Sequence, residues 1–147
     1  MKKTITVEGF EIGTEENHEA LTGVSVIIAK KGATAGCCVR GSAPGTRETD
    51  LLKSEKTVEQ VHSIVLSGGS AFGLESTCGV MNYLEEVGVG FDVGVARVPI
   101  VCGAVLFDLA VGDLDIGTND DEIVMLIDLN IRHGNTHFIS LDRKSVV

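Results

Sequence analysis

The stretch that decides the fold is IVLSGGSAFGL, at residues 64–74. Residues 61–66 form an apolar run of strand length, and residues 67–70 form a small polar turn. Apolar side chains then recur at helical spacing, at Leu74, Cys78, Met81, Leu84 and Val87. These patterns predict a strand, a sharp turn and a helix that stops at Gly88.

The turn itself is a candidate site. Its two glycines can adopt backbone angles that other residues avoid, and Ser70 is suited to cap the helix by accepting a backbone N–H bond. The turn is either a purely structural feature or part of a pocket wall that touches substrate. The substrate-binding residues of the second interpretation are Ser67, Gly68, Gly69 and Ser70.

Two better-known glycine motifs do not fit this turn. A nucleophile elbow, G-x-S-x-G, requires a glycine where Phe72 stands. A phosphate-binding loop requires a lysine directly after its last glycine, but Leu74 follows Gly73. Neither hydrolysis by an elbow serine nor nucleotide binding is therefore predicted from the turn.

Composition limits the class of protein. A chain of 147 residues predicts a single domain, and 44% hydrophobic residues predict an ordinary folded core. The net charge of −9 and the absence of a basic block argue against nucleic-acid binding. No apolar run approaches the length of a membrane span, and the first residues do not resemble a signal peptide. We expect no membrane partner and a cytoplasmic location.

The remaining segments predict an α+β protein. Residues 4–7 suggest a strand and residues 13–20 a loop, while residues 24–29 and 33–39 suggest a hairpin. Residues 40–50 suggest an ordered loop whose charged residues either pair with one another or hold a charged group of the substrate. Helical turns are expected at 54–60, extended segments at 90–95 and 98–101, and a buried strand or turn at 104–109.

The sequence predicts neither a metal site nor a cofactor. The four cysteines lack a C-x-x-C pair and are expected to be buried and reduced. The acidic residues 113–122 lack the ligand pattern of a calcium loop and are expected to be a solvated loop. His133 and His137 are expected on the surface, because the residues between them are poor helix formers.

Several long strings resemble one family. They are VRG at 39–41, APGTRETDLL at 43–52, VHSIVLSGGSAFGL at 61–74 and GFDVGVARVPIV at 90–101. Together they resemble the DmpA-type L-aminopeptidase/D-esterase family, which includes β-peptidyl aminopeptidases and nylon-oligomer hydrolases. The resemblance covers about residues 5 to 116.

This resemblance implies a four-layer αββα sandwich of the N-terminal-nucleophile hydrolase type. Members of that family cleave their own precursor before a Ser or Thr, which then acts as nucleophile while its new α-amino group acts as base. The implied substrates are small peptides, amides and esters, with no cofactor. Relatives assemble as homo-oligomers, so a homo-oligomer is expected here.

The chain also departs from the family. Ser42 replaces a usual glycine, and Cys102-Gly103 replaces a more familiar Pro-Ala. Family members are considerably longer, and no segment here resembles the part that carries their nucleophile. We therefore expect residues 1–116 to be a partial αββα sandwich and residues 117–147 to be a divergent tail, within a single domain. The catalytic residue stays unknown, with Thr136 as a candidate because an Asn-Thr junction precedes a strand-like segment.

The resulting hypothesis is a truncated, self-processing Ser/Thr aminopeptidase or amidase-esterase that is inactive as this short chain. The alternative is a non-enzymatic subunit or binding module that keeps the half-fold. A third hypothesis is a chain without a stable native state, since a missing half would leave an apolar sheet exposed.

Overall fold

The predicted strand, turn and helix are present in the computed structural model, which describes residues 7–111. The elements of this region are β1 (Glu11–Asn17), β2 (Thr22–Ala33), β3 (Thr46–Arg47), the 3₁₀ helix η1 (Asp50–Leu52), β4 (Val61–Ser67), the 3₁₀ helix η2 (Phe72–Glu75), α1 (Ser76–Glu86), β5 (Phe91–Asp92), β6 (Arg97–Val98) and β7 (Val101–Val105). The mixture of helix and sheet confirms the coarse class, while the four-layer sandwich stays a prediction.

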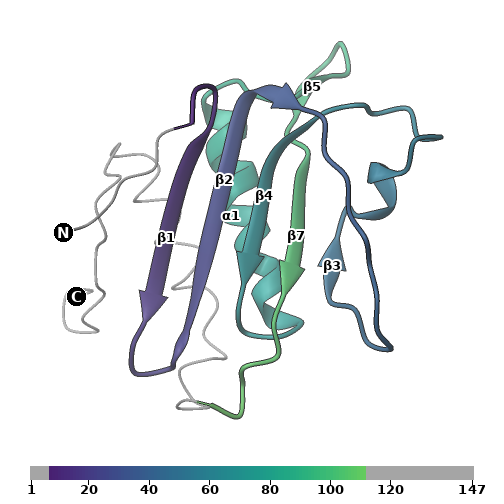
Figure 1. The fold of residues 1–147 in the computed structure, drawn as a ribbon. Coiled ribbons are helices and arrows are strands. Elements are labelled where there is room, and N and C mark those ends of the chain that lie inside the picture. Colours follow the sequence, from purple (N-terminus) through teal and green to yellow (C-terminus); the bar gives the residue numbers. More distant parts are fainter. Residues whose placement is uncertain (1–6, 112–147) are drawn as a thin grey trace.

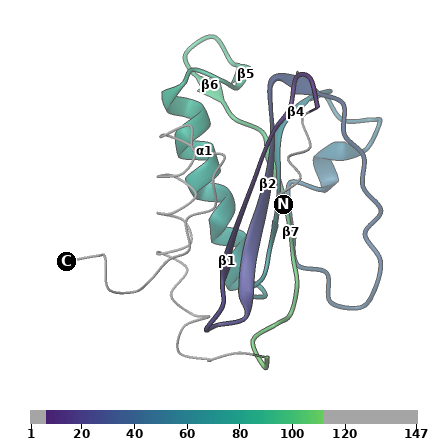
Figure 2. The ribbon, with the colours of Figure 1, turned by 60° about the vertical axis from the view of Figure 1, so that its left-hand side comes forward.

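Five strands form one sheet in the order β1-β2-β4-β7-β3 (Figure 1). β4 and β7 are parallel, and the other pairs within this sheet are antiparallel. A parallel pair needs a crossover connection, which η2 and α1 provide. Figure 2 shows α1 lying against one face of the sheet, with β5 and β6 forming a separate hairpin beyond its end.

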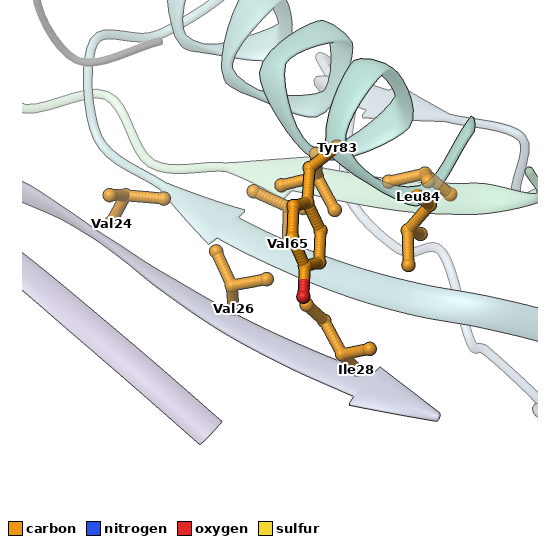
Figure 3. Close-up of a cluster of buried hydrophobic side chains, with 8 residues drawn as sticks. Val24, Val26, Ile28, Val65, Tyr83 and Leu84 are labelled. Carbon is orange, nitrogen blue, oxygen red and sulfur yellow. The ribbon is translucent and has the colours of Figure 1, made fainter. Parts of the chain in front are cut away.

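The core lies between α1 and the sheet (Figure 3). Its buried side chains come from β2, β4, β7 and α1, namely Val24, Val26, Ile28, Val65, Val80, Tyr83, Leu84 and Val101. Val80 and Leu84 are fully buried. Packing of these aliphatic side chains holds the helix in place and thereby positions the turn that precedes it.

The helix buries a different stripe from the predicted one. Its buried residues are Ser76, Thr77, Gly79, Val80, Tyr83 and Leu84, whereas Val87 is 48% exposed. Small residues on this stripe let the helix approach β7 closely: a Cβ at Gly103 would lie 2.6 Å from the Thr77 methyl group. The buried stripe shares Leu84 with the predicted one and begins with three small or polar residues, Ser76, Thr77 and Gly79, which apolar spacing does not reveal.

The predicted hairpin of residues 24–29 and 33–39 is wrong. β2 runs through Lys30, Lys31 and Gly32 to Ala33, with an irregularity in its pairing with β4 after Ile28. Its hairpin partner is β1, which lies in the stretch that we expected to be a loop. β1 is an edge strand with both faces largely exposed, so its polar sequence carries no alternation of apolar residues.

Other expected segments are shorter than predicted. Residues 54–60 form no helix, and the helical turn lies earlier, in η1. The extended segment at 90–95 contains only the two residues of β5, and β7 ends at Val105. The predicted strand at 4–7 lies almost wholly outside the described residues. Within residues 7–111, no helix has the length and hydropathy to cross a bilayer.

Candidate functional site

The turn after β4 has a defined and partly strained backbone. Gly69 has φ of +79° and Ser70 has φ of +56°. Left-handed angles are unfavourable for a residue with a Cβ, so the surroundings must hold Ser70 in place. The N–H of Gly68 donates to the Gly23 carbonyl at 2.9 Å, and the N–H of Ser70 donates to the Leu106 carbonyl at 2.9 Å. The turn is thus tied to the start of β2 and to the segment after β7.

A carboxylate joins the same three segments. Asp108 Oδ1 accepts the N–H of Gly69 at 2.7 Å, and Asp108 Oδ2 accepts the Thr22 hydroxyl at 2.7 Å. A Cβ on Gly68 would overlap both Asp108 Oδ2 and Thr22 Oγ1. We call this set of Thr22, Gly68, Gly69 and Asp108 the junction. The junction can form because Gly68 has no side chain that would occupy the space of Asp108 and Thr22.

Sequence reasoning missed Asp108 and Thr22. The available signal was positional: Asp108 follows the apolar run of β7, just as the turn follows β4. Since β4 and β7 are parallel neighbours, their carboxyl ends meet at the same edge of the sheet, where ligands commonly bind in α/β proteins. The sequence alone does not show that β4 pairs with β7, so nothing in it distinguishes Asp108 from the other acidic residues.

A cleft of about 620 Å³ lies beside the junction. The strand register places Thr14, Ser25, Leu66 and Ala104 in one row across β1, β2, β4 and β7, on the face opposite the core. This row lines the cleft together with Glu15, Glu16, Leu21, Thr22, Gly23, Val24, Ser67, Gly68, Val105, Leu106 and Asp108. The lining combines aliphatic side chains with carboxylates and hydroxyls, and it contains neither Lys nor Arg.

Of the four turn residues predicted to bind substrate, two lie at the cleft. Ser67 and Gly68 line the cleft, whereas Gly69 and Ser70 do not. Ser67 is only 4% exposed, and its hydroxyl has no partner among the described residues. The predicted helix cap is wrong: α1 begins at Ser76, and neither η2 nor α1 has a side-chain cap bond. Thr136 lies outside the described residues.

The charged loop at 40–50 does not lock itself by mutual ion pairs. Arg47 instead reaches α1, where its guanidinium donates to Thr77 Oγ1 at 2.6 Å and to Cys78 Sγ at 3.0 Å. Asp50 pairs with Lys53 and Lys56, and the hydrogen bond from Lys53 is the main reason that the pKa of Asp50 is lowered. These contacts favour a structural role for the loop.

The expectation of four buried cysteines is confirmed for one of them and wrong for the other three. Cys37 and Cys38 are exposed, Cys78 is half-buried, and only Cys102 is buried. Burial raises the pKa of Cys102 to about 11. Among residues 7–111, no group of three or more His, Cys, Asp or Glu side chains could hold a metal ion. The acidic segment at 113–122 and both His133 and His137 lie outside this region.

A second, smaller cleft of about 340 Å³ lies near the opposite end of β4 and includes His62. The backbone N–H of Ile100 donates to His62 Nδ1 at 3.1 Å, so this nitrogen is unprotonated in the structure. Burial lowers the pKa of His62 below its ordinary value of 6.5. Three basic residues, Lys30, Lys31 and Arg97, also line this cleft. Lys30 pairs with Glu11, and Arg97 donates to the Gly88 carbonyl.

The lowered pKa of His62 predicts a pH-dependent stability. The unfolded chain takes up a proton as the pH falls through about 6.5, whereas the folded chain resists it, so His62 destabilises the fold below that pH. Urea unfolding at about pH 7.5 and about pH 5.5 should show a larger loss of stability for wild type than for His62→Gln, which does not titrate. An equal loss in both proteins would show that His62 is not the group responsible.

A strand, turn, helix and parallel strand with a cleft at the strands' carboxyl ends define a mixed α/β protein with a candidate ligand site at that edge of the sheet. The family model described as Peptidase family S58 matches residues 3–121. This match covers most of the chain, and the protein therefore belongs to peptidase family S58, the DmpA family. The resemblance seen in the sequence is confirmed.

Individual relatives agree with this assignment. An uncharacterised aminopeptidase of Mycobacterium bovis is 52% identical over 92 residues, which cover 61% of this chain and 26% of the relative. An uncharacterised aminopeptidase of Mycobacterium leprae is 48% identical over 91 residues, covering 62% of this chain and 25% of the relative. The 6-aminohexanoate-oligomer endohydrolase of Paenarthrobacter ureafaciens is 31% identical over 102 residues, covering 69% of this chain and 26% of the relative. The matched segment thus spans about a quarter of these proteins.

Proposed function

We propose that this chain is part of a self-processing Ser/Thr N-terminal-nucleophile hydrolase that acts on the amino-terminal residues of small peptides, amides or esters. The observation that carries the proposal is the cleft beside the junction, at the carboxyl ends of β4 and β7, in a member of peptidase family S58. Ser67 and Gly68 form part of its substrate-binding wall, and Gly69 and Ser70 complete the turn that carries this wall.

The chemistry of the cleft is compatible with such substrates. Leu21, Leu66 and Leu106 offer aliphatic contact, and the carboxylates of the lining suit a substrate with a free amino group. The relatives' names describe aminopeptidases and a hydrolase of 6-aminohexanoate oligomers. Both descriptions fit amide substrates with an aliphatic body.

Neither serine of the turn is an activated nucleophile in the described part of the chain. The hydroxyls of Ser67 and Ser70 are hydrogen-bonded to no His, Lys or carboxylate within residues 7–111. A serine hydroxyl is a weak nucleophile without an adjacent base. We therefore propose that residues 7–111 form the binding scaffold, and that the 147-residue chain is inactive unless Thr136 supplies the nucleophile.

An alternative is a non-enzymatic subunit or binding module, and one observation favours it. The sheet face opposite α1 exposes large apolar side chains in the described region, including Ile12 at 42% and Leu66 at 50%. Exposed apolar surface of this kind marks an interaction surface. In the enzyme hypothesis, the part of this face outside the cleft, which includes Ile12, is covered by the second sheet of an αββα sandwich.

Two measurements on the purified 147-residue chain separate these possibilities. Intact mass after long incubation at neutral pH should stay at the uncut value, and hydrolysis of aminoacyl amides should be undetectable. Fragments that end at Asn135 and start at Thr136 would contradict the proposed inactivity, provided that Thr136→Val abolishes them. Turnover in wild type but not in Thr136→Val would assign the nucleophile and reject the non-enzymatic alternative.

A further inference from the structure

The junction connects the cleft to the strained turn. Three of its members, Thr22, Gly68 and Asp108, line the cleft, and the fourth, Gly69, belongs to the left-handed part of the turn. Both carboxylate oxygens of Asp108 are engaged, one with the turn and one with the start of β2. Hydrogen bonds to a carboxylate are stronger than neutral ones, so Asp108 adds a strong side-chain contact to the backbone bonds that hold the turn.

Backbone hydrogen bonds also hold the turn: Gly68 donates to the Gly23 carbonyl, and the Ser67 carbonyl accepts the N–H of Leu106, both at 2.9 Å. Within residues 7–111 the Ser70 side chain makes no hydrogen bond, and Ser70 itself is held at a positive φ by backbone contacts: its N–H donates to Leu106 and its carbonyl accepts the N–H of Gly73 at 3.1 Å. Loss of the Asp108 carboxylate would leave the Gly69 N–H unpaired and allow Ser70 to relax to a negative φ. The wall of the cleft at Gly68 would move with it.

We propose that Asp108, held by Thr22, is a positioning residue that fixes the turn at 67–70 in the conformation needed to bind substrate. Asp108 acts through the backbone of Gly69 and has no proposed part in bond cleavage. The claim that the turn binds substrate rests on the proposed function, whereas the claim that Asp108 fixes the turn rests on the junction alone. Separate experiments test these two claims.

The geometry is tested without any ligand, by NMR on the 147-residue chain. In wild type, Ser70 should show the strong intraresidue amide-to-Hα NOE that is typical of a positive φ. Asp108→Ala should weaken this NOE and move the Gly69 amide signal upfield. Asp108→Asn should retain both features, because its amide oxygen still accepts from Gly69 and its NH₂ group can donate to Thr22. Unchanged Gly69 and Ser70 signals in Asp108→Ala would overturn the proposal.

Substrate binding is tested with L-leucinamide, a small amide with a free amino group, by following the amide signals of Gly68 and Thr22. Asp108→Ala and Thr22→Val should bind it about tenfold or more weakly than wild type. Thr22→Ser, which keeps the hydroxyl, should bind like wild type. Equal affinities in wild type and Asp108→Ala would overturn the proposed role of Asp108 while leaving the proposed function intact.

Ser63→Ala is the matched control for a general loss of stability. Its hydroxyl donates to the Ile27 carbonyl at 2.8 Å, also from β4 to β2 but away from the cleft lining. It should be destabilised without a change in leucinamide affinity or in the Ser70 NOE. If Ser63→Ala weakened binding as much as Asp108→Ala, a positioning role would be rejected. If wild type did not bind leucinamide, the proposed function and the substrate part of this inference would both fail, and the Ser70 NOE would still decide the geometric part.

Discussion

Replacing Gly73 with alanine is expected to destabilise the protein by about 3 kcal/mol. A Cβ at this position would overlap the carbonyl oxygen of Gly68 and would lie 3.0 Å from both the carbonyl carbon of Gly68 and Ser67 Oγ. These neighbours are backbone atoms and a buried side chain at the end of β4, so they cannot move without disturbing the turn. Urea unfolding followed by circular dichroism would measure the loss.

Gly13→Ala provides the control for the loss of a glycine. Gly13 lies in β1, and a Cβ there would meet nothing within 4 Å. Its stability should stay within about 0.5 kcal/mol of wild type. If Gly73→Ala unfolded at the same urea concentration as Gly13→Ala, the close approach of η2 to the turn would be wrong.

Replacing Gly103 with alanine is expected to destabilise the protein by about 1–3 kcal/mol through overpacking. The new methyl group would lie 2.6 Å from Thr77 Cγ2, and Thr77 is held by two hydrogen bonds. Its hydroxyl accepts from Arg47 and donates to the Leu74 carbonyl. The side chain therefore cannot rotate away from the sheet without losing them. Thermal unfolding of the variant would show a lower midpoint.

A second substitution tests that cause. Thr77→Ser removes the methyl group but keeps the hydroxyl and both of its hydrogen bonds. Combined with Gly103→Ala, it should recover most of the lost stability, so the two effects should be strongly non-additive. Additive effects would mean that Thr77 is not the obstacle. The contact between Gly103 and Thr77 also gives a physical reason for the glycine at 103, where the family more often has alanine.

The candidate site was only partly predictable. The turn at 67–70 stood out because its residue types are suited to a tight turn, and Ser67 and Gly68 do line the cleft. Thr22 and Asp108 were not predicted, because they are 86 positions apart in the chain and only the fold brings them within hydrogen-bond distance. A contact of this range leaves no local pattern in a single sequence.

The sequence by itself determined the strand, turn and helix around residues 64–74, the mixed helix and sheet class and the family, because apolar spacing, turn residues and long family strings are local properties. Tertiary structure decided the partners. Strand pairing placed the polar residues of β1 in the sheet and extended β2 through Lys30 and Lys31. Packing against the sheet buried the face of α1 that includes Thr77 and Gly79, and the fold placed Asp108 beside the turn. Each of these outcomes depends on which strands pair and how closely a helix approaches them, and those free energies arise only between segments that are distant in the chain.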